Sequence, residues 1–113
     1  MRSAQWFTDE FTWSAAEKKT ARKAFDQAYQ QKCRDIASEV KKMVARLSTP
    51  SDLWEIHDYL SEQRKTIDRT FDYRYSVLIS VFGHLLREGW LTETDLIGLR
   101  EDKLEKIKQW ASL

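Results

Sequence analysis

The sequence predicts an all-α protein, elongated in shape, on three observations. Its 113 residues contain only three glycines and one proline, so few positions favour turns or interrupt helices. Apolar side chains recur at helical spacing, and the alternation typical of strands is nowhere sustained. Charged residues make up 33% of the chain and hydrophobic ones 42%, which is typical of helices with solvated outer faces. We expect a single helical domain spanning residues 1–113.

The first twelve residues have no helical period, yet they contain Trp6, Phe7 and Phe11. A disordered tail is normally poor in aromatic residues. We therefore expect residues 1–12 to form a partly ordered arm that contacts the body of the molecule or a partner.

A long first helix is predicted to begin after Ser14, because Ser14 and Glu17 have the spacing of a capping box. The helix should run to about Leu47. Apolar side chains follow it at steps of three and four, close to the 3.5-residue period of lengthwise packing. These residues are Phe25, Tyr29, Cys33, Ile36, Val40, Met43 and Leu47. A rod of roughly 50 Å overhangs a compact monomer, whose radius of gyration is about 14 Å, so part of this seam needs a second subunit.

A shorter second helix is predicted to restart at Thr49, which can cap it, with Pro50 in the first turn and Asp52 at the positive end of the dipole. The side chains expected to point inward are Leu53, Ile56, Leu60 and Ile67. The pattern breaks near residues 68–70. We expect residues 14–67 to form a long-helix dimerisation part with two-fold symmetry.

Residues 71–113 are predicted to form a helical head of three short helices. Thr70 or Asp72 can cap the first, and Gly89 ends it. Thr92 and Asp95 cap a second, very short helix, and the last should span about Glu101 to Ala111. The apolar face of the first is expected to hold Tyr75, Leu78, Ile79, Phe82, Leu85 and Leu86. The second holds Leu96 and Leu99, and the last holds Leu104, Ile107 and Ala111.

Composition excludes several classes of function. A formal charge of +1 with interleaved acids and bases argues against a nucleic-acid binder, including a transcriptional regulator. The lone Cys33 suits a reducing compartment, and without an apolar run of membrane length or a signal-peptide core we expect a cytoplasmic protein without membrane insertion. Two histidines in no metal-binding spacing predict no metal, no cofactor and no enzymatic activity.

The second helix places Trp54, His57, Asp58 and Arg64 within four turns. Adjacent helical residues diverge by about 100°, so His57 and Asp58 are not expected to pair. Arg64 has two open alternatives. It can form an exposed pair with Asp68 in its own helix, or it can meet Asp58 of a second copy crossing antiparallel, with Trp54 covering the pair.

The head offers a second candidate cluster. Trp90 and Trp110 can gather with Lys103, Lys106 and Lys108 where the last helix packs back, and aromatic residues beside cations are typical of interaction sites. Equally, both tryptophans can be core residues.

At these positions the chain resembles the fluorescence recovery protein family of cyanobacteria, over almost its whole length from Trp13 onwards. The matching residues are densest in the second helix, where a Trp, a His, an Asp and an Arg occur close together. The matching segments are residues 24–30, 52–64, 67–68, 74–77, 81–82, 88–89, 102–103 and 106–108.

The resemblance implies an all-α homodimeric regulator that is not an enzyme. It implies binding to the C-terminal domain of the photoactivated, red form of orange carotenoid protein, faster return to the orange form, and an end to phycobilisome quenching. By the family pattern, the dimer interface contains Leu53, Trp54, His57, Asp58 and Arg64, and partner binding involves Phe82, Lys106 and Trp110.

One position departs from the family pattern. Ser80 stands where the resemblance implies an aromatic residue, so an apolar anchor on the partner-binding surface is missing. The alternative is therefore a homologous dimeric helical module that acts on a different protein, possible in an organism without phycobilisomes.

Overall fold

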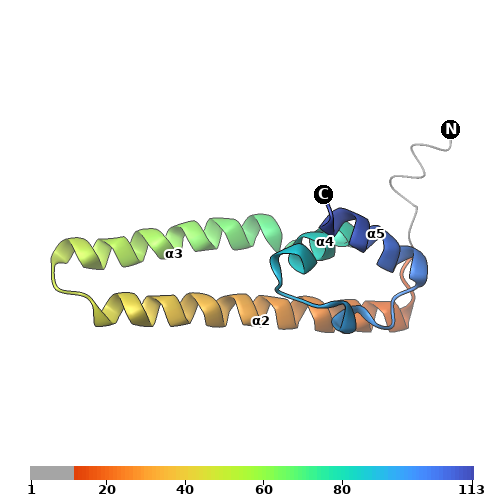
Figure 1. Ribbon diagram of the computed structural model, residues 1–113, viewed down its shortest axis with the longest axis horizontal. Coiled ribbons are helices and arrows are strands. Elements are labelled where there is room, and N and C mark those ends of the chain that lie inside the picture. Colours follow the sequence, from red (N-terminus) through yellow and green to blue (C-terminus); the bar gives the residue numbers. More distant parts are fainter. Residues whose placement is uncertain (1–11) are drawn as a thin grey trace.

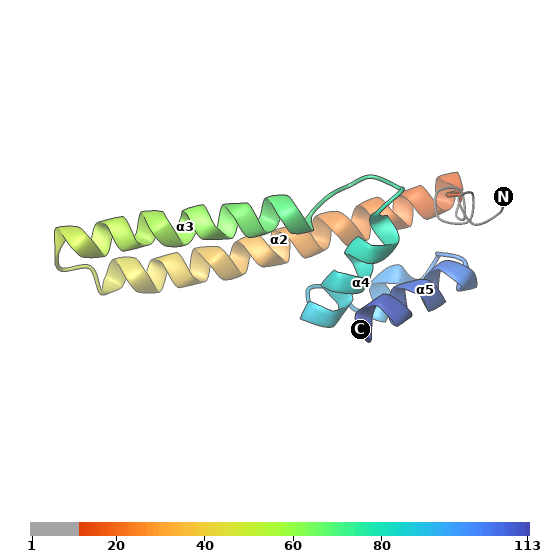
Figure 2. The ribbon, with the colours of Figure 1, turned by 90° about the horizontal axis from the view of Figure 1, so that it is seen from above.

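The computed structural model describes residues 12–113, and its regular elements are helices. They are α2 (Ala15–Ala45), α3 (Pro50–Thr70), α4 (Leu78–Glu88), the 3₁₀ helix η1 (Glu93–Leu96) and α5 (Glu101–Ala111). Helices α2 and α3 form a long antiparallel hairpin, and α4 and α5 lie beside the first half of α2 (Figures 1 and 2). The molecule measures 60 × 29 × 25 Å with a radius of gyration of 17.5 Å. The prediction of an elongated all-α protein is confirmed, whereas the aromatic residues of the N-terminal arm lie outside the described residues.

The helix starts follow the capping patterns in the sequence. The Ser14 hydroxyl accepts the Glu17 amide at 3.1 Å, and the Glu17 carboxylate accepts the Ser14 amide at 3.0 Å. Thr49 and Asp52 repeat this arrangement at the start of α3, with Pro50 in the first helical position. At η1 the Asp95 carboxylate accepts the Thr92 amide at 2.8 Å. Each cap is decided within four residues, so local sequence was sufficient to predict it.

The start of the third helix was predicted wrongly. Thr70 is the last residue of α3, and α4 begins only at Leu78, with no side-chain cap. Tyr75 therefore lies before the helix and not on its apolar face. The physical reason is a ladder of aromatic contacts that packs the connecting segment against α2 outside a helix, with ring centroids 4.9–5.5 Å apart. Its members are Trp13, Phe25, Tyr29, Phe71, Tyr73 and Tyr75.

The apolar core lies between the first half of α2 and the head. Alanines of α2 allow η1 and its flanking loops to approach the α2 backbone, while Leu78, Phe82, Leu85 and Ile107 are fully buried. Beyond this core, the buried apolar residues of the described chain are Ile36 and Ile56 alone. The far half of the hairpin thus buries very little apolar surface by itself.

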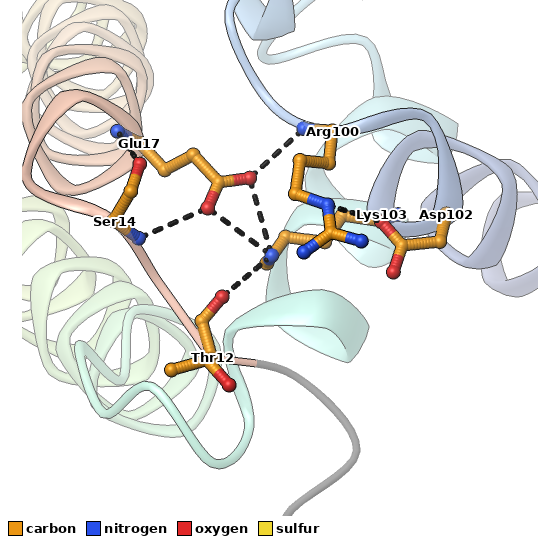
Figure 3. A network of polar contacts seen from close by, with 6 residues as sticks. All are labelled: Thr12, Ser14, Glu17, Arg100, Asp102 and Lys103. Atoms are coloured by element: carbon orange, nitrogen blue, oxygen red, sulfur yellow. Dashed lines mark hydrogen bonds and ion pairs between the residues drawn. The ribbon is translucent and has the colours of Figure 1, made fainter.

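A buried ion pair joins the start of α2 to α5 (Figure 3). The Lys103 ammonium lies 3.1 Å from the Glu17 carboxylate, and it also donates to the Thr12 carbonyl at 2.8 Å. Oε2 of the same carboxylate also accepts a hydrogen bond from the Arg100 amide at 2.9 Å. Both charged side chains are at least 97% buried, with exposures of 1% and 3%. The same carboxylate therefore caps α2 and anchors the loop that leads into α5.

Helix α5 crosses α4 so closely that a side chain at Gly83 has no room. A Cβ there would clash with Cβ of Trp110 and lie 3.1 Å from the Ile107 carbonyl. We expect Gly83→Ala to lower the free energy of unfolding by about 1–3 kcal/mol, since overpacking outweighs the better helix propensity of alanine. Thermal unfolding followed by circular dichroism checks this, with exposed Glu88→Ala on the same helix as control. An unchanged melting temperature for Gly83→Ala would contradict the close crossing.

Candidate functional site

The predicted cluster on α3 is exposed in the single chain. The side chains of His57, Asp58 and Arg64 are 68%, 79% and 79% exposed, and Trp54 is 62% exposed. The Trp54 and His57 rings meet edge to face, with centroids 6.2 Å apart. This part of the hairpin has little apolar core of its own. A tryptophan so exposed there is typical of a surface that binds another protein.

Two polar contacts on α3 can be compared with the predictions. Nδ1 of His57 lies 3.4 Å from Oδ1 of Asp58, so the expectation that these neighbours cannot pair was wrong. The side chains are long enough to bend toward each other across the divergence of their Cβ vectors. Nε of Arg64 lies 3.3 Å from Oδ1 of Asp68, which is the exposed intrahelical alternative. Both pairs are open to water and contribute little to stability, so a second molecule can replace them at low cost.

The predicted inward face of α3 needs correction. Ile56 is buried and Ile67 partly buried, but Leu53 is 50% exposed and Leu60 is 43% exposed. At about 100° per residue, Leu53 and Leu60 are turned away from Ile56 toward the face of Arg64. Helix α2 therefore covers the Ile56 edge of this stripe and leaves the Leu53 and Leu60 edge exposed. The large apolar side chains exposed on the hairpin, here called the hairpin apolar surface, are Tyr29, Val44, Leu47, Leu53, Trp54 and Leu60.

A hollow of about 400 Å³ adjoins this surface where α2, α3 and the connecting segment meet. Arg64 and Asp68 lie at its polar side, and the rings of Phe25, Tyr29 and Phe71 line its apolar side. Its interaction with Cys33, together with partial burial, raises the pKa of the Tyr29 hydroxyl above its ordinary value.

The head residues expected to bind a partner have different environments. Trp110 is 48% exposed and Lys106 is partly buried, but Phe82 is 0% exposed. Phe82 points into the core between α4 and α2 because it shares a face with Leu78 and Leu85. In the single chain Phe82 therefore packs beneath the head surface, and its part in partner binding stays a prediction.

The predicted tryptophan–lysine cluster does not form around Lys103. Lys103 turns inward to Glu17, with its ammonium 5.1 Å from the Trp13 ring centroid. Trp90 packs against the core and lies under the ammonium of Lys32 from α2, at 4.9 Å. The core alternative thus holds for Trp90, and Trp110 is the half-exposed member of the two.

Sequence reasoning missed the buried charge at Lys103. It lies four residues before Ile107, so it shares the apolar face of the last helix. A lysine on an apolar face indicates a buried partner, and Glu17 was already placed by its capping box. Only the tertiary fold brings these two residues, 86 positions apart, together.

A second hollow, of about 310 Å³, separates the end of α3 from α4. Ser80 lines it together with Arg69, Thr70, Val81 and His84. The Ser80 hydroxyl donates to the Val77 carbonyl at 2.9 Å, so it turns back toward its own helix. The head has a depression here with a cationic rim.

Metal-binding groups and membrane-spanning helices are two further features to consider in residues 12–113. No group of three or more His, Cys, Asp or Glu side chains there could hold a metal ion. Within the same range, no helix is both long and apolar enough to cross a membrane.

Comparison with known proteins agrees with this geometry. The model of a family described as photoprotection regulator fluorescence recovery protein matches residues 13–111. The fluorescence recovery protein of Synechocystis sp. (strain ATCC 27184 / PCC 6803 / Kazusa) is 40% identical over 106 residues, which cover 94% of this chain and 97% of that protein.

Solved structures give the same result for the fold. The fluorescence recovery proteins of Fremyella diplosiphon and Synechocystis sp. PCC 6803 each superpose with a TM-score of 0.85, at 37% and 39% identity. Each match covers 90% of this chain and all of the other. The resemblance noted in the sequence is confirmed: the chain belongs to the fluorescence recovery protein family of photoprotection regulators.

Proposed function

We propose that this chain is a homodimeric, non-enzymatic regulator that binds the C-terminal domain of red, photoactivated orange carotenoid protein. It accelerates reversion to the orange form and thereby ends phycobilisome quenching. Membership of the family, over residues 13–111, is the observation that carries this proposal.

The hairpin apolar surface supports the dimer. Apart from Tyr29, its exposed side chains lie on the far half of the hairpin, where Ile36 and Ile56 are the only buried residues. In a two-fold contact Leu53 and Trp54 are covered, and Arg64 exchanges Asp68 for Asp58 of the partner subunit. His57 lies beside both. Because each contact in a two-fold interface occurs twice, a small gain per contact is doubled.

The head supports partner binding. Trp110 offers half of its indole to solvent above α4, and Lys106 lies one turn before it on α5. A partly exposed aromatic ring close to a cation is typical of residues that dominate binding energy. The buried Phe82 holds this surface in place from below.

The action on the carotenoid protein is a catalysed conformational change. A protein accelerates such a change only if it binds the transition region more tightly than the red ground state. An elongated dimer with two heads can hold two separated domains near each other, which lowers the entropic cost of their reclosure.

The direct test is the dark recovery of red orange carotenoid protein. We expect substoichiometric amounts of this chain to speed the loss of red absorbance at least about tenfold, which corresponds to about 1.4 kcal/mol of barrier. Serum albumin at the same concentration is the control. Unchanged decay at a tenfold molar excess would contradict the proposal.

A second candidate function rests on Ser80. The depression beside Ser80, Arg69 and His84 differs from the protruding ring that the resemblance implies, and it favours a partner with a complementary shape. In this alternative, the same dimer acts on another protein. Failure in the dark-recovery assay, together with dimerisation through the hairpin, would favour it.

A further inference from the structure

The first half of α2 carries a concentrated positive charge that the near-neutral total conceals. Lys18, Lys19, Arg22 and Lys23 fall within six residues and are all exposed; together they are called the basic face. The whole chain has a formal charge of +1, so without these four cations it would be −3. Residues 18–23 thus have a local charge of +4, although the chain as a whole is nearly neutral.

The acids near the basic face do not neutralise it. Glu17 is turned into the interior and bound to Lys103. Asp26 lies 3.6 Å from Arg22 and compensates that one guanidinium. Within the described chain, no ion pair engages Lys19 or Lys23. Two ammonium groups one turn apart thus have no ion-pair partner within 4 Å among the described residues.

Aromatic rings of the connecting segment hold the edge of the basic face in place. The Arg22 guanidinium lies 4.3 Å from the Tyr73 ring centroid, and the Lys18 ammonium lies 5.2 Å from that of Tyr75. The Tyr73 hydroxyl donates to the Lys18 carbonyl at 3.5 Å. Cations fixed over rings lose less side-chain entropy when they bind an anionic group.

An apolar position adjoins the other edge. Ile97 is 71% exposed, the second most exposed large apolar side chain of the described residues. It borders a hollow of about 340 Å³ lined by Thr20, Lys23, Gln27, Thr94, Asp95 and Ile97. The one carboxylate in this lining, that of Asp95, is bound to the Thr92 amide and hydroxyl.

The glycine that follows Ile97 sets the path of this loop against α2. Gly98 follows it with φ of +118°, and a Cβ there would lie 2.7 Å from the Thr20 hydroxyl oxygen. Only glycine allows the loop to pass so close to α2. The exposed isoleucine is therefore fixed beside Lys23, and the two form a preformed apolar and cationic pair.

We propose that the basic face and the Ile97 hollow together bind an acidic helix of the protein partner. An apolar side chain of that helix enters the hollow beside Ile97. Carboxylates three or four residues apart on it, at about 5–6 Å spacing, meet Lys19 and Lys23, which are themselves four residues apart. An apolar centre with a charged rim is the usual arrangement in a protein–protein interface. A nucleic acid would give the exposed isoleucine no apolar partner.

This inference rests on the proposed function, with orange carotenoid protein as the partner used in the test. Lys19→Glu/Lys23→Glu is compared with Lys41→Glu/Lys42→Glu, a matched pair of exposed lysines on the far half of the same helix. Both double variants change the net charge by the same amount. The readouts are the concentration giving half-maximal acceleration of dark recovery, its dependence on salt, and the oligomeric state by light scattering.

We expect Lys19→Glu/Lys23→Glu to raise the half-maximal concentration at least about tenfold and to flatten its salt dependence, because the contact is electrostatic. Lys41→Glu/Lys42→Glu should change the half-maximal concentration less than about threefold. Ile97→Asp should also raise the half-maximal concentration without altering the fold, since the side chain is exposed.

Equal behaviour of the two double variants, with an active wild type, would overturn this inference alone. An inactive wild type would overturn the proposed function, and tighter binding to a DNA duplex than to the carotenoid protein would overturn the assignment of a protein helix.

Discussion

Replacing Lys103 with methionine is expected to destabilise the protein by about 3–5 kcal/mol, the range found when one partner of a buried ion pair is removed. Glu17 would be left 3% exposed without its counter-ion, although two backbone amides would still donate to it. A loss of this size is a large part of the total stability of a small domain. Urea unfolding followed by circular dichroism measures it.

Two comparisons separate the buried pair from a simple loss of charge. Lys108→Met removes a lysine from the same helix, but its pair with Glu93 is exposed on both sides, so the expected cost is below about 1 kcal/mol. Glu17→Gln/Lys103→Met removes both charges and should recover part of the stability lost in Lys103→Met. Equal costs for Lys103→Met and Lys108→Met would refute the burial of the pair.

The same pair makes stability depend on pH. Burial acts to raise the pKa of Glu17, but hydrogen bonds from the Ser14 and Arg100 amides and from Lys103 outweigh it and lower the pKa from 4.5 to about 2. A carboxylate with a lowered folded-state pKa contributes its stability above pH 4.5 and loses it as the pH falls toward 2. Wild type should therefore lose about 3 kcal/mol more than Glu17→Gln over this interval.

What the sequence could predict was local. The caps at Ser14, Thr49 and Thr92 each depend on residues three apart, and the last helix was predicted at its observed bounds, Glu101–Ala111. The failures were tertiary. Residues 71–77 contain capping residues and helical spacing, but ring packing against α2 keeps them out of a helix, and nothing in a local window indicates which long-range contact will prevail.

The site shows the same division. The cluster from Trp54 to Arg64 was recognisable because four unusual side chains lie within four turns of one helix. Spacing could not decide which apolar residues α2 would cover, and it placed Leu53 and Leu60 inward. Burial depends on the width of the neighbouring helix and on its crossing, which only the assembled hairpin defines. Lys103 was misplaced for a related reason, since its partner lies on another helix.

Replacing Leu53 with glutamate is expected to convert the proposed dimer into monomers at micromolar concentration. Two-fold symmetry places the new carboxylate in the apolar seam twice, and each copy costs at least about 2 kcal/mol. Together these raise the dissociation constant roughly a thousandfold. Light scattering coupled to size-exclusion chromatography measures the mass directly.

The half-exposed position of Leu53 makes this test clean. Because its side chain is 50% exposed in the single chain, the substitution should leave the helical circular dichroism unchanged, whereas Ile56→Glu, at 8% exposure, should unfold the hairpin as well. Ser51→Glu adds the same charge to the first turn of α3 on a different face and should leave the dimer intact. A Leu53→Glu variant that remains dimeric would show that the hairpin apolar surface binds something other than a second copy. If Leu53→Glu is monomeric as expected, its dark-recovery activity shows whether dimerisation is needed for the reaction or only for the stability of the hairpin.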